Sequence, residues 1–504
     1  SLLPPYEALI EGCQVFVSSY FQLGFIPKAV FLERLANDRE SVSVFLLLSM
    51  LSISARFTPS LVRMFGDGLS ATETFMRRAT SLVPGEMYKP TLERTQGFFL
   101  LSTAEWGHGD RDRSFMHMGI AVRMAGLLQL HREETYRLPN NHTPEDVIKA
   151  EVARRTFWMI ESQSNLQSGL NVPSAFSLSD ISTLLPCDEK DFAFGFEPLE
   201  RASLIGSASP QELTSLPSRS LFATLIQAHG FWGQVARRAC QWENFSSAPW
   251  DRSSGYHRLA SSLSEWERNL PERHRWSVQN LRGYRAESVD LAYLSVTMVI
   301  RLSSIVIRRI YLPYGISSTS NNTGWGPAPQ LYWKNMSEEL FNNVHDLYEQ
   351  ISASFPFRTR GSPPILVFCV YICGSLASYL CKWPQLCPSV APHAYSMFHK
   401  ALNVLTDLQH AWPKARPWQN ALAVAATLFP QQDTSSCDEV LEPRVSNSSY
   451  VTTFVSEVYI RSLFYTSGYP SQPHFCTHLG EFAVSIARAY CCAHVFLEVK
   501  SVGS

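Results

Sequence analysis

The chain has 504 residues, of which 45% are hydrophobic and 17% are charged. This balance excludes a disordered chain and allows a large buried core, and the length permits roughly two to four domains. The formal net charge is −1 and no dense basic run occurs, which argues against a chain that itself grips a phosphate backbone through clustered Lys and Arg.

The N-terminus lacks the charged start and the apolar core of a signal peptide. We therefore expect the eleven cysteines, which show no even spacing, to be reduced and intracellular. The chain starts at Ser1 without a methionine, which is typical of a fragment of a longer protein.

Apolar residues at three- and four-residue spacing predict several helices before residue 111. The segment 42–56 is apolar on nearly every side, which predicts a central position, and its apolar run is too short to span a bilayer. The predicted helices in this part are 5–23, one after the turn at 24–27, 42–56, 70–82 and 90–105.

An amphipathic helix is predicted from Arg111 onward. Gly119 and Gly126 lie seven residues apart and share one face, so we expect a neighbouring helix to approach closely there. The expected buried stripe consists of Phe115, Met118, Val122 and Ala125, widened by Ala121, Met124 and Leu128.

A second helix is predicted to begin at Thr143, whose hydroxyl suits an N-cap. Pro144 suits the first helical position, and the two acids that follow suit the positive end of the helix dipole. Arg154 and Arg155 fall in the middle of this helix, beside buried aromatic residues. The helix is expected to break at 169–173.

After residue 186 we expect an acidic, aromatic turn at 187–195, an exposed loop at 201–219 and a connector at 271–285. Further flexible loops are predicted at 316–329 and 431–449. The predicted helices of this part are 221–242, 256–269, 290–312, 337–353, 364–380, 392–411, 418–428, 450–465 and 479–498.

No strand alternation or short repeat is visible, so the sequence predicts an all-α fold of packed antiparallel helices with long irregular loops. We expect a core in residues 1–200 and a helical continuation in residues 201–504. The uncharged segment 361–381 is about long enough to span a membrane. Its two initial prolines, its serines and its tyrosines favour a core helix, so we predict no membrane partner.

A series of residues in the region 111–186 matches a known pattern in order. They are Gly119, Ala121, Arg123, Met124, Ala125, Leu128, Leu130, His131, Arg132, Glu151, Arg154, Arg155, Trp158, Gly169, Pro173, Asp180, Ile181, Leu185 and Pro186. With these residues the region resembles the regulatory middle region of fungal zinc-cluster transcription factors, and residues 4–31 resemble that family's opening helix. The sequence departs from the family pattern at Gln129, at 161–165 and at 169–173.

This resemblance implies a nuclear protein that controls transcription by RNA polymerase II and binds promoter DNA through a segment outside this chain. Zinc is then expected only in a zinc cluster upstream of Ser1, and no cofactor is expected in the chain itself. The implied partners are a small-molecule effector, transcription co-regulators and a second copy in a homodimer. The alternative is a helical scaffold or corepressor without any DNA-contacting segment.

Six side chains on the two central helices form the candidate site. One interpretation is that the basic ones pair with Glu105, Asp112, Glu151 or Asp180 and with helix carbonyls, which fixes how the helices dock. The other is an anion-binding wall of an effector pocket, and the pairing interpretation is favoured. The six residues are Arg123, His131, Arg132, Arg154, Arg155 and Trp158.

The candidates for a metal site are weak. No C-x2-C spacing occurs, and four tetrahedral ligands need short loops that wrap the ion. We therefore favour the interpretation that the cysteines at 369–387 are small buried hydrophobic residues. For the segment 474–478 we favour a surface loop. The residues concerned are Cys369, Cys373, Cys381 and Cys387 in the first group and His474, Cys476 and His478 in the second.

Enzyme signatures are also weak. A terpene-cyclase reading of an all-α chain needs two Mg²⁺ motifs. Asn37 and Ser41 begin like one of them, but Phe45 stands where the chelating Glu belongs. No nucleophile elbow, P-loop, zincin motif or dinucleotide fingerprint is present. We predict that the chain is not an enzyme.

Overall fold

The structure, a computed structural model, describes residues 2–19, 24–168, 174–202, 219–240, 247–312, 327–354 and 363–426. Within these ranges the chain forms α-helices and short 3-10 helices and contains no strand, which confirms the all-α prediction. The 3-10 helices are η2 (Arg39–Ser41), η3 (Ala55–Phe57), η4 (Glu133–Tyr136), η6 (Leu178–Asp180), η8 (Glu272–His274), η11 (Pro384–Leu386), η12 (Ala391–His393) and η13 (Pro413–Ala415).

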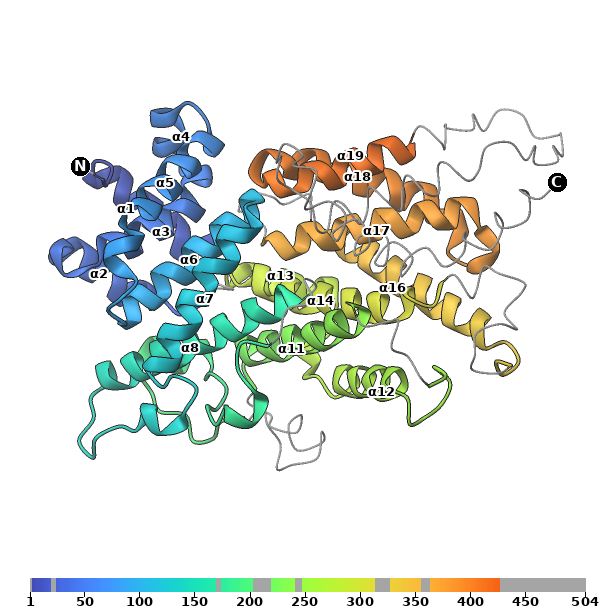
Figure 1. The fold of residues 1–504 in the computed structure, drawn as a ribbon, viewed down its shortest axis with the longest axis horizontal. Helices are drawn as coiled ribbons and strands as arrows, with labels where there is room; N and C mark the ends of the chain where they lie inside the picture. Colours follow the sequence, from blue (N-terminus) through green and yellow to red (C-terminus); the bar gives the residue numbers. More distant parts are fainter. Residues whose placement is uncertain are drawn as a thin grey trace, which may run out of the picture.

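The N-terminal helices surround α3. Every residue of α3 from Phe45 to Ser54 is buried, as its apolar composition predicts, and α3 packs against α1, α5 and α6. Figure 1 shows this group at the blue end of the molecule. It comprises α1 (Tyr6–Ser19), α2 (Lys28–Asn37), α3 (Val44–Ser54), α4 (Pro59–Phe65), α5 (Gly68–Glu86), α6 (Leu92–His108) and α7 (Arg111–Leu127).

The C-terminal helices surround α14 and α17. Within the described residues these two helices are long and apolar enough to cross a membrane, as is the bent pair 44–65 if it counts as one span. However, 83% of the apolar window of each single helix is buried inside the molecule, as in core helices. The group comprises α12 (Gly255–Arg268), α13 (Val278–Ala286), α14 (Asp290–Arg309), α16 (Tyr332–Ser354), α17 (Pro364–Lys382), α18 (Ala394–Ala411) and α19 (Arg416–Ala426).

The two groups are joined by α8 (Pro144–Leu166) and α11 (Leu221–Cys240). In α11, Phe222 belongs to the N-terminal hydrophobic core and Leu225 to the C-terminal one. The helix α11 packs against α8 on one side and α14 on the other, and Figure 1 shows it between them. A Cβ at Gly233 would lie 2.2 Å from Asn165 Oδ1, so the α8–α11 approach requires glycine there. This junction positions the site described below.

Several local predictions are wrong. Phe115 is 42% exposed, because the buried face of α7 starts at Ser114 and His117. The members of the expected stripe that are buried are Met118, Ala121, Met124 and Ala125. Among the residues that the structure describes, no atom of a neighbouring element lies within 4 Å of a Cβ at Gly119, and at Gly126 the one such atom is a ring carbon of Phe176 at 3.9 Å. The expected close approach of a helix at these glycines therefore does not occur.

Two short helices were predicted as irregular chain. The acidic turn contains α9 (Glu189–Phe194), which Asp188 caps and Gly195 ends in the left-handed region. The connector contains η8 and α13. Both helices are shorter than the ten or so residues over which periodicity separates helix from loop. The predictions for 169–173, 431–449, 450–465 and 479–498 and for most of 201–219 and 316–329 lie outside the described residues.

Candidate functional site

The start of α8 sets the position of the site. The Thr143 side chain accepts a hydrogen bond from the Asp146 amide at 3.3 Å, and the Asp146 carboxylate accepts one from the Thr143 amide at 3.0 Å. This reciprocal capping box begins the helix at Pro144, as predicted. Ten residues later the helix places two consecutive arginines in the interior.

Arg154 binds the loop before α8. Its guanidinium donates to both carboxylate oxygens of Glu133, at 2.5 and 2.7 Å, and to the carbonyl of Leu184 at 3.1 Å. It also lies over the Tyr136 ring, 4.2 Å from the centroid. A fork-to-fork pair of this kind fixes orientation as well as distance.

Arg155 is fully buried and has four polar partners. It donates to Glu151 at 3.0 Å and to Glu189 at 2.5 Å. It also donates to the backbone carbonyls of Gly24 and Cys187, both at 3.0 Å. One guanidinium thereby joins the loop after α1, the segment before α9 and α8 itself.

Trp158 and Glu151 complete the cluster. The indole N–H donates to the Leu184 carbonyl at 2.8 Å. The Glu151 carboxylate accepts from the Cys187 amide at 3.0 Å and lies 2.8 Å from Arg201. Burial opposes ionisation of Glu151, but the surrounding arginines outweigh it and hold its pKa below the ordinary value. We call Glu133, Glu151, Arg154, Arg155, Trp158, Glu189 and Arg201 the arginine network.

The remaining sequence-predicted site residues lie elsewhere. Arg123 and Arg132 are exposed, so the expectation of buried basic groups is wrong for both. The His131 ring stacks on Phe176 with centroids 5.8 Å apart, and burial lowers its pKa. The structure therefore brings together Arg154, Arg155 and Trp158 but not the other three.

Of the predicted acidic partners, Glu151 pairs with the arginines, but Glu105 binds His117 at 2.7 Å instead. Asp112 is exposed, and Asp180 has only a through-space effect on His131. The network partners Glu133 and Glu189 were missed. They lie 21 and 34 residues from their arginines, and no local spacing signals such pairs.

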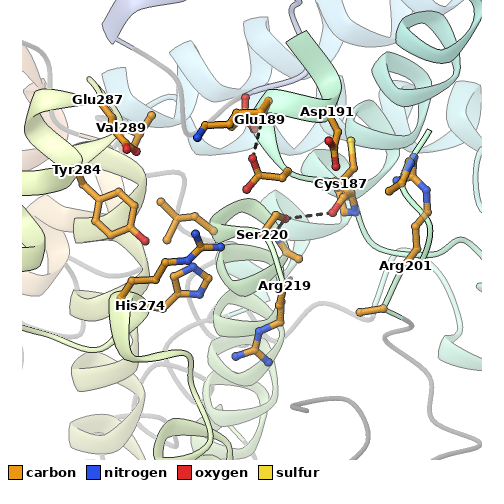
Figure 2. Close-up of a pocket in the computed structure, with 18 of the residues that line it drawn as sticks. Cys187, Glu189, Asp191, Arg201, Arg219, Ser220, His274, Tyr284, Glu287 and Val289 are labelled. Carbon is orange, nitrogen blue, oxygen red and sulfur yellow. Dashed lines mark hydrogen bonds between the residues drawn. The ribbon is translucent and has the colours of Figure 1, made fainter. Parts of the chain in front are cut away.

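A cleft of about 1280 Å³ adjoins the arginine network. Its walls are the segment 186–202, the residues at the start of α11, and η8 with α13. Figure 2 shows two members of the arginine network, Glu189 and Arg201, among the residues that line the cleft, together with Cys187. Ser220 also lines the cleft, and its hydroxyl donates to the Pro186 carbonyl at 3.1 Å.

Arg219 lines this cleft, whereas the sequence predicted it to end the exposed loop 201–219. It is 3% exposed, and none of its three guanidinium nitrogens has a hydrogen-bond partner among the residues that the structure describes. The guanidinium carbon lies over the Trp266 ring, 5.8 Å from its centroid. Burial lowers the pKa of Arg219 to about 10.

His274 lies on the same side of the cleft as Arg219 (Figure 2). It is 1% exposed, and its Nδ1 lies 2.9 Å from the Thr224 hydroxyl. Burial, together with the charges of Arg273 and Arg219, lowers its pKa to about 3. His274 is therefore a neutral imidazole at physiological pH. Its Nε2 has no partner among the described residues.

The cysteine candidates behave as small core residues. Cys369 and Cys373 are fully buried on α17, with their thiols 3.9 Å from the carbonyls of Met298 and Val344. Burial raises the pKa of Cys373 to about 12, so its thiol stays protonated. In the described part of the chain, no three His, Cys, Asp or Glu side chains are grouped to hold a metal. The second candidate group, 474–478, lies outside that part.

Residues 14–223 match the family model described as the fungal specific transcription factor domain. An uncharacterized transcriptional regulatory protein of Schizosaccharomyces pombe is 27% identical over 314 residues, which cover 58% of this chain and 45% of that protein. The Zn(2)-C6 fungal-type transcription factor FTF1c of Fusarium oxysporum f. sp. lycopersici is 25% identical over 323 residues, which cover 61% of this chain and 34% of that protein.

The Zn(2)-C6 fungal-type transcription factor FTF2 of the same Fusarium oxysporum strain is 23% identical over 384 residues, 73% of this chain and 35% of that protein. The chain thus spans less than half the length of each of these relatives. No solved structure matches it. The match to the family model includes the whole arginine network.

Proposed function

We propose that this chain, which carries a fungal specific transcription factor domain over residues 14–223, is the regulatory part of a zinc-cluster transcription factor. The factor acts in the nucleus on RNA polymerase II transcription. It reaches promoter DNA through a segment outside this chain, and that segment holds the zinc. The observation that carries the proposal is the family match, together with its relatives named as transcriptional regulators.

The arginine network supports a control unit in preference to a reaction site. Its charged groups are paired with one another and with backbone carbonyls, so they serve docking of helices and leave no free acid or base. Regulation then works by population shift. An effector or co-regulator that prefers one packing of the helices changes the exposed surface, by no more than its differential affinity for the two packings.

A reporter assay tests this proposal. Residues 1–504 are fused to a heterologous DNA-binding domain in a fungal host, with the reporter under the matching operator. We expect the fusion to change reporter output several-fold relative to the DNA-binding domain alone. The matched variants are Arg155→Met, which breaks the network, and Arg123→Ala, which removes an exposed charge. An unchanged reporter in a host that accumulates the folded fusion contradicts the proposal.

The second candidate is a scaffold or corepressor without any DNA-contacting segment. The net charge of −1 and the lack of a dense basic run favour it for this chain taken by itself. Promoter occupancy by the intact protein separates the two. Occupancy that depends on six paired cysteines elsewhere in the protein supports the transcription factor. Occupancy only through another DNA-bound protein supports the scaffold.

A further inference from the structure

The guanidinium of Arg219 is buried, and no residue that the structure describes pairs with it. Buried charges are normally paired, because removal from water costs far more than packing returns. The arginine network obeys that rule. Arg219 does not, although it borders a cleft with room for a small molecule. An anion in the cleft would supply the missing partner.

His274 adds a second, directional requirement. The Thr224 hydroxyl donates to the Ser220 carbonyl at 3.2 Å, so its oxygen accepts from His274 Nδ1–H. A neutral imidazole that donates through Nδ1 is an acceptor at Nε2. Two buried residues of the cleft lining, Arg219 and His274, therefore supply one guanidinium and one neutral acceptor that lack partners among the described residues.

The rest of the lining limits the charge of the ligand. Among the residues around the cleft are six carboxylates and four Lys or Arg side chains, which leaves a net charge of −2. Figure 2 shows Glu189, Asp191 and Glu287 on the side opposite Arg219 and His274. Such a lining repels a polyanion such as a nucleotide and tolerates a monoanion or a zwitterion.

We propose that the cleft binds a small monocarboxylic acid with a hydroxyl or ammonium group on the carbon next to the carboxylate. The carboxylate pairs with Arg219, and the hydroxyl or ammonium donates to His274 Nε2. The regulatory consequence rests on the function proposed above. Arg219 precedes α11, the helix shared by the two cores, so a ligand that fixes Arg219 also fixes that junction.

The test uses the purified 504-residue chain and four six-carbon probes, with dissociation constants measured by ligand-observed NMR. The probes are 2-hydroxyhexanoate, norleucine, hexanoate and hexylamine. We expect the first two to bind, hexanoate to bind about tenfold more weakly because it cannot donate to His274, and hexylamine not to bind. The hydroxy and amino arms show which donor the cleft prefers.

Arg219→Met tests whether the Arg219 guanidinium binds the carboxylate. We expect it to weaken 2-hydroxyhexanoate binding by about tenfold or more, while the free protein stays at least as stable as wild type. The control is Arg273→Met, which removes the same charge from an exposed residue of the lining and is expected to leave binding within about threefold. His274→Phe is expected to abolish the preference over hexanoate.

Three outcomes overturn this inference: no carboxylate binds, binding survives Arg219→Met, or Arg219→Met fails to fold. The last would show that Arg219 has a structural partner. These outcomes leave the reporter assay untouched, because that assay needs no ligand. Conversely, a silent reporter with intact, Arg219-dependent binding would remove the proposed function and keep the ligand site.

Discussion

The arginine network and the cleft beside it each contain a buried guanidinium, but the two guanidinium groups differ in their hydrogen-bond partners. Arg155 is fully buried and donates to two carboxylates and two carbonyls. Arg219 is 3% exposed and, within the described part of the chain, donates to none. Cys187, Glu189 and Arg201 border both places, so the two environments are neighbours.

The difference separates a buried charge whose partners lie in the chain from one that has no partner among the described residues. In the network every partner belongs to the chain, so removing one arginine strands several groups at once. In the cleft no described residue is a partner of Arg219, so removing this arginine relieves a cost in the free protein. The sign of the change in the free energy of unfolding therefore distinguishes the two kinds of buried arginine.

Arg155→Met is expected to have the largest effect. It leaves Glu151 and Glu189 without their main cation and the carbonyls of Gly24 and Cys187 without a donor. Loss of one partner of a buried pair costs about 3–5 kcal/mol. The free energy of unfolding, measured by urea titration, should fall by that amount. A loss below about 1 kcal/mol would show that the network does not hold the fold together.

Trp158→Phe tests the edge of the network. The variant loses the indole N–H bond to the Leu184 carbonyl, which Arg154 still satisfies, and leaves a small cavity. We expect a loss of about 2 kcal/mol in urea unfolding. Leu127→Ala, at a side chain that is 72% exposed, is the control and should change stability by less than about 0.5 kcal/mol.

Glu161 is the acidic counterpart of Arg219, since it is 3% exposed and its Oε2 has no hydrogen-bond partner among the described residues. Burial raises its pKa from 4.5 to about 7, against a smaller opposing effect of Arg237. The folded chain then binds a proton more readily than the unfolded chain. This contribution to stability is complete below the ordinary pKa and is lost as pH rises through about 7.

Glu161→Gln removes this pH dependence. At pH 8 we expect the variant to be about 1–2 kcal/mol more stable than wild type, and at pH 4 the two should unfold at nearly the same urea concentration. Urea titrations at the two pH values check this. A difference in unfolding free energy between the two proteins that does not change with pH would contradict a raised pKa of Glu161.

Arg123→Ala is expected to have the smallest effect. Arg123 is exposed on α7, so its replacement should change the free energy of unfolding by less than about 0.5 kcal/mol. Thermal unfolding monitored by circular dichroism checks this. A loss as large as that of Arg155→Met would place Arg123 in a contact that the structure does not show.

These effects also show what the sequence predicted and why. The start of α8 was predictable because Thr143 and Asp146 lie within one turn and act locally. The centrality of α3 followed from its composition alone. The exposure of Phe115 was not predictable, since periodicity gives a stripe but the neighbouring helices decide which stripe is covered.

The site was predictable only in part. The two arginines and Trp158 on α8 were found from the sequence, but the partners Glu133 in η4 and Glu189 in α9 lie 21 and 34 residues away. Arg219 gave no signal, because its distinguishing property is the lack of a partner. That property exists only once the chain has folded around it.

The stability of the Arg219→Met chain without ligand tests the central comparison most directly. Urea unfolding of this variant and of wild type, side by side at pH 7, gives the sign of the change. A midpoint equal to or above that of wild type is the predicted result, because an unpaired buried charge has been removed. A midpoint lowered as far as that of Arg155→Met would contradict the account.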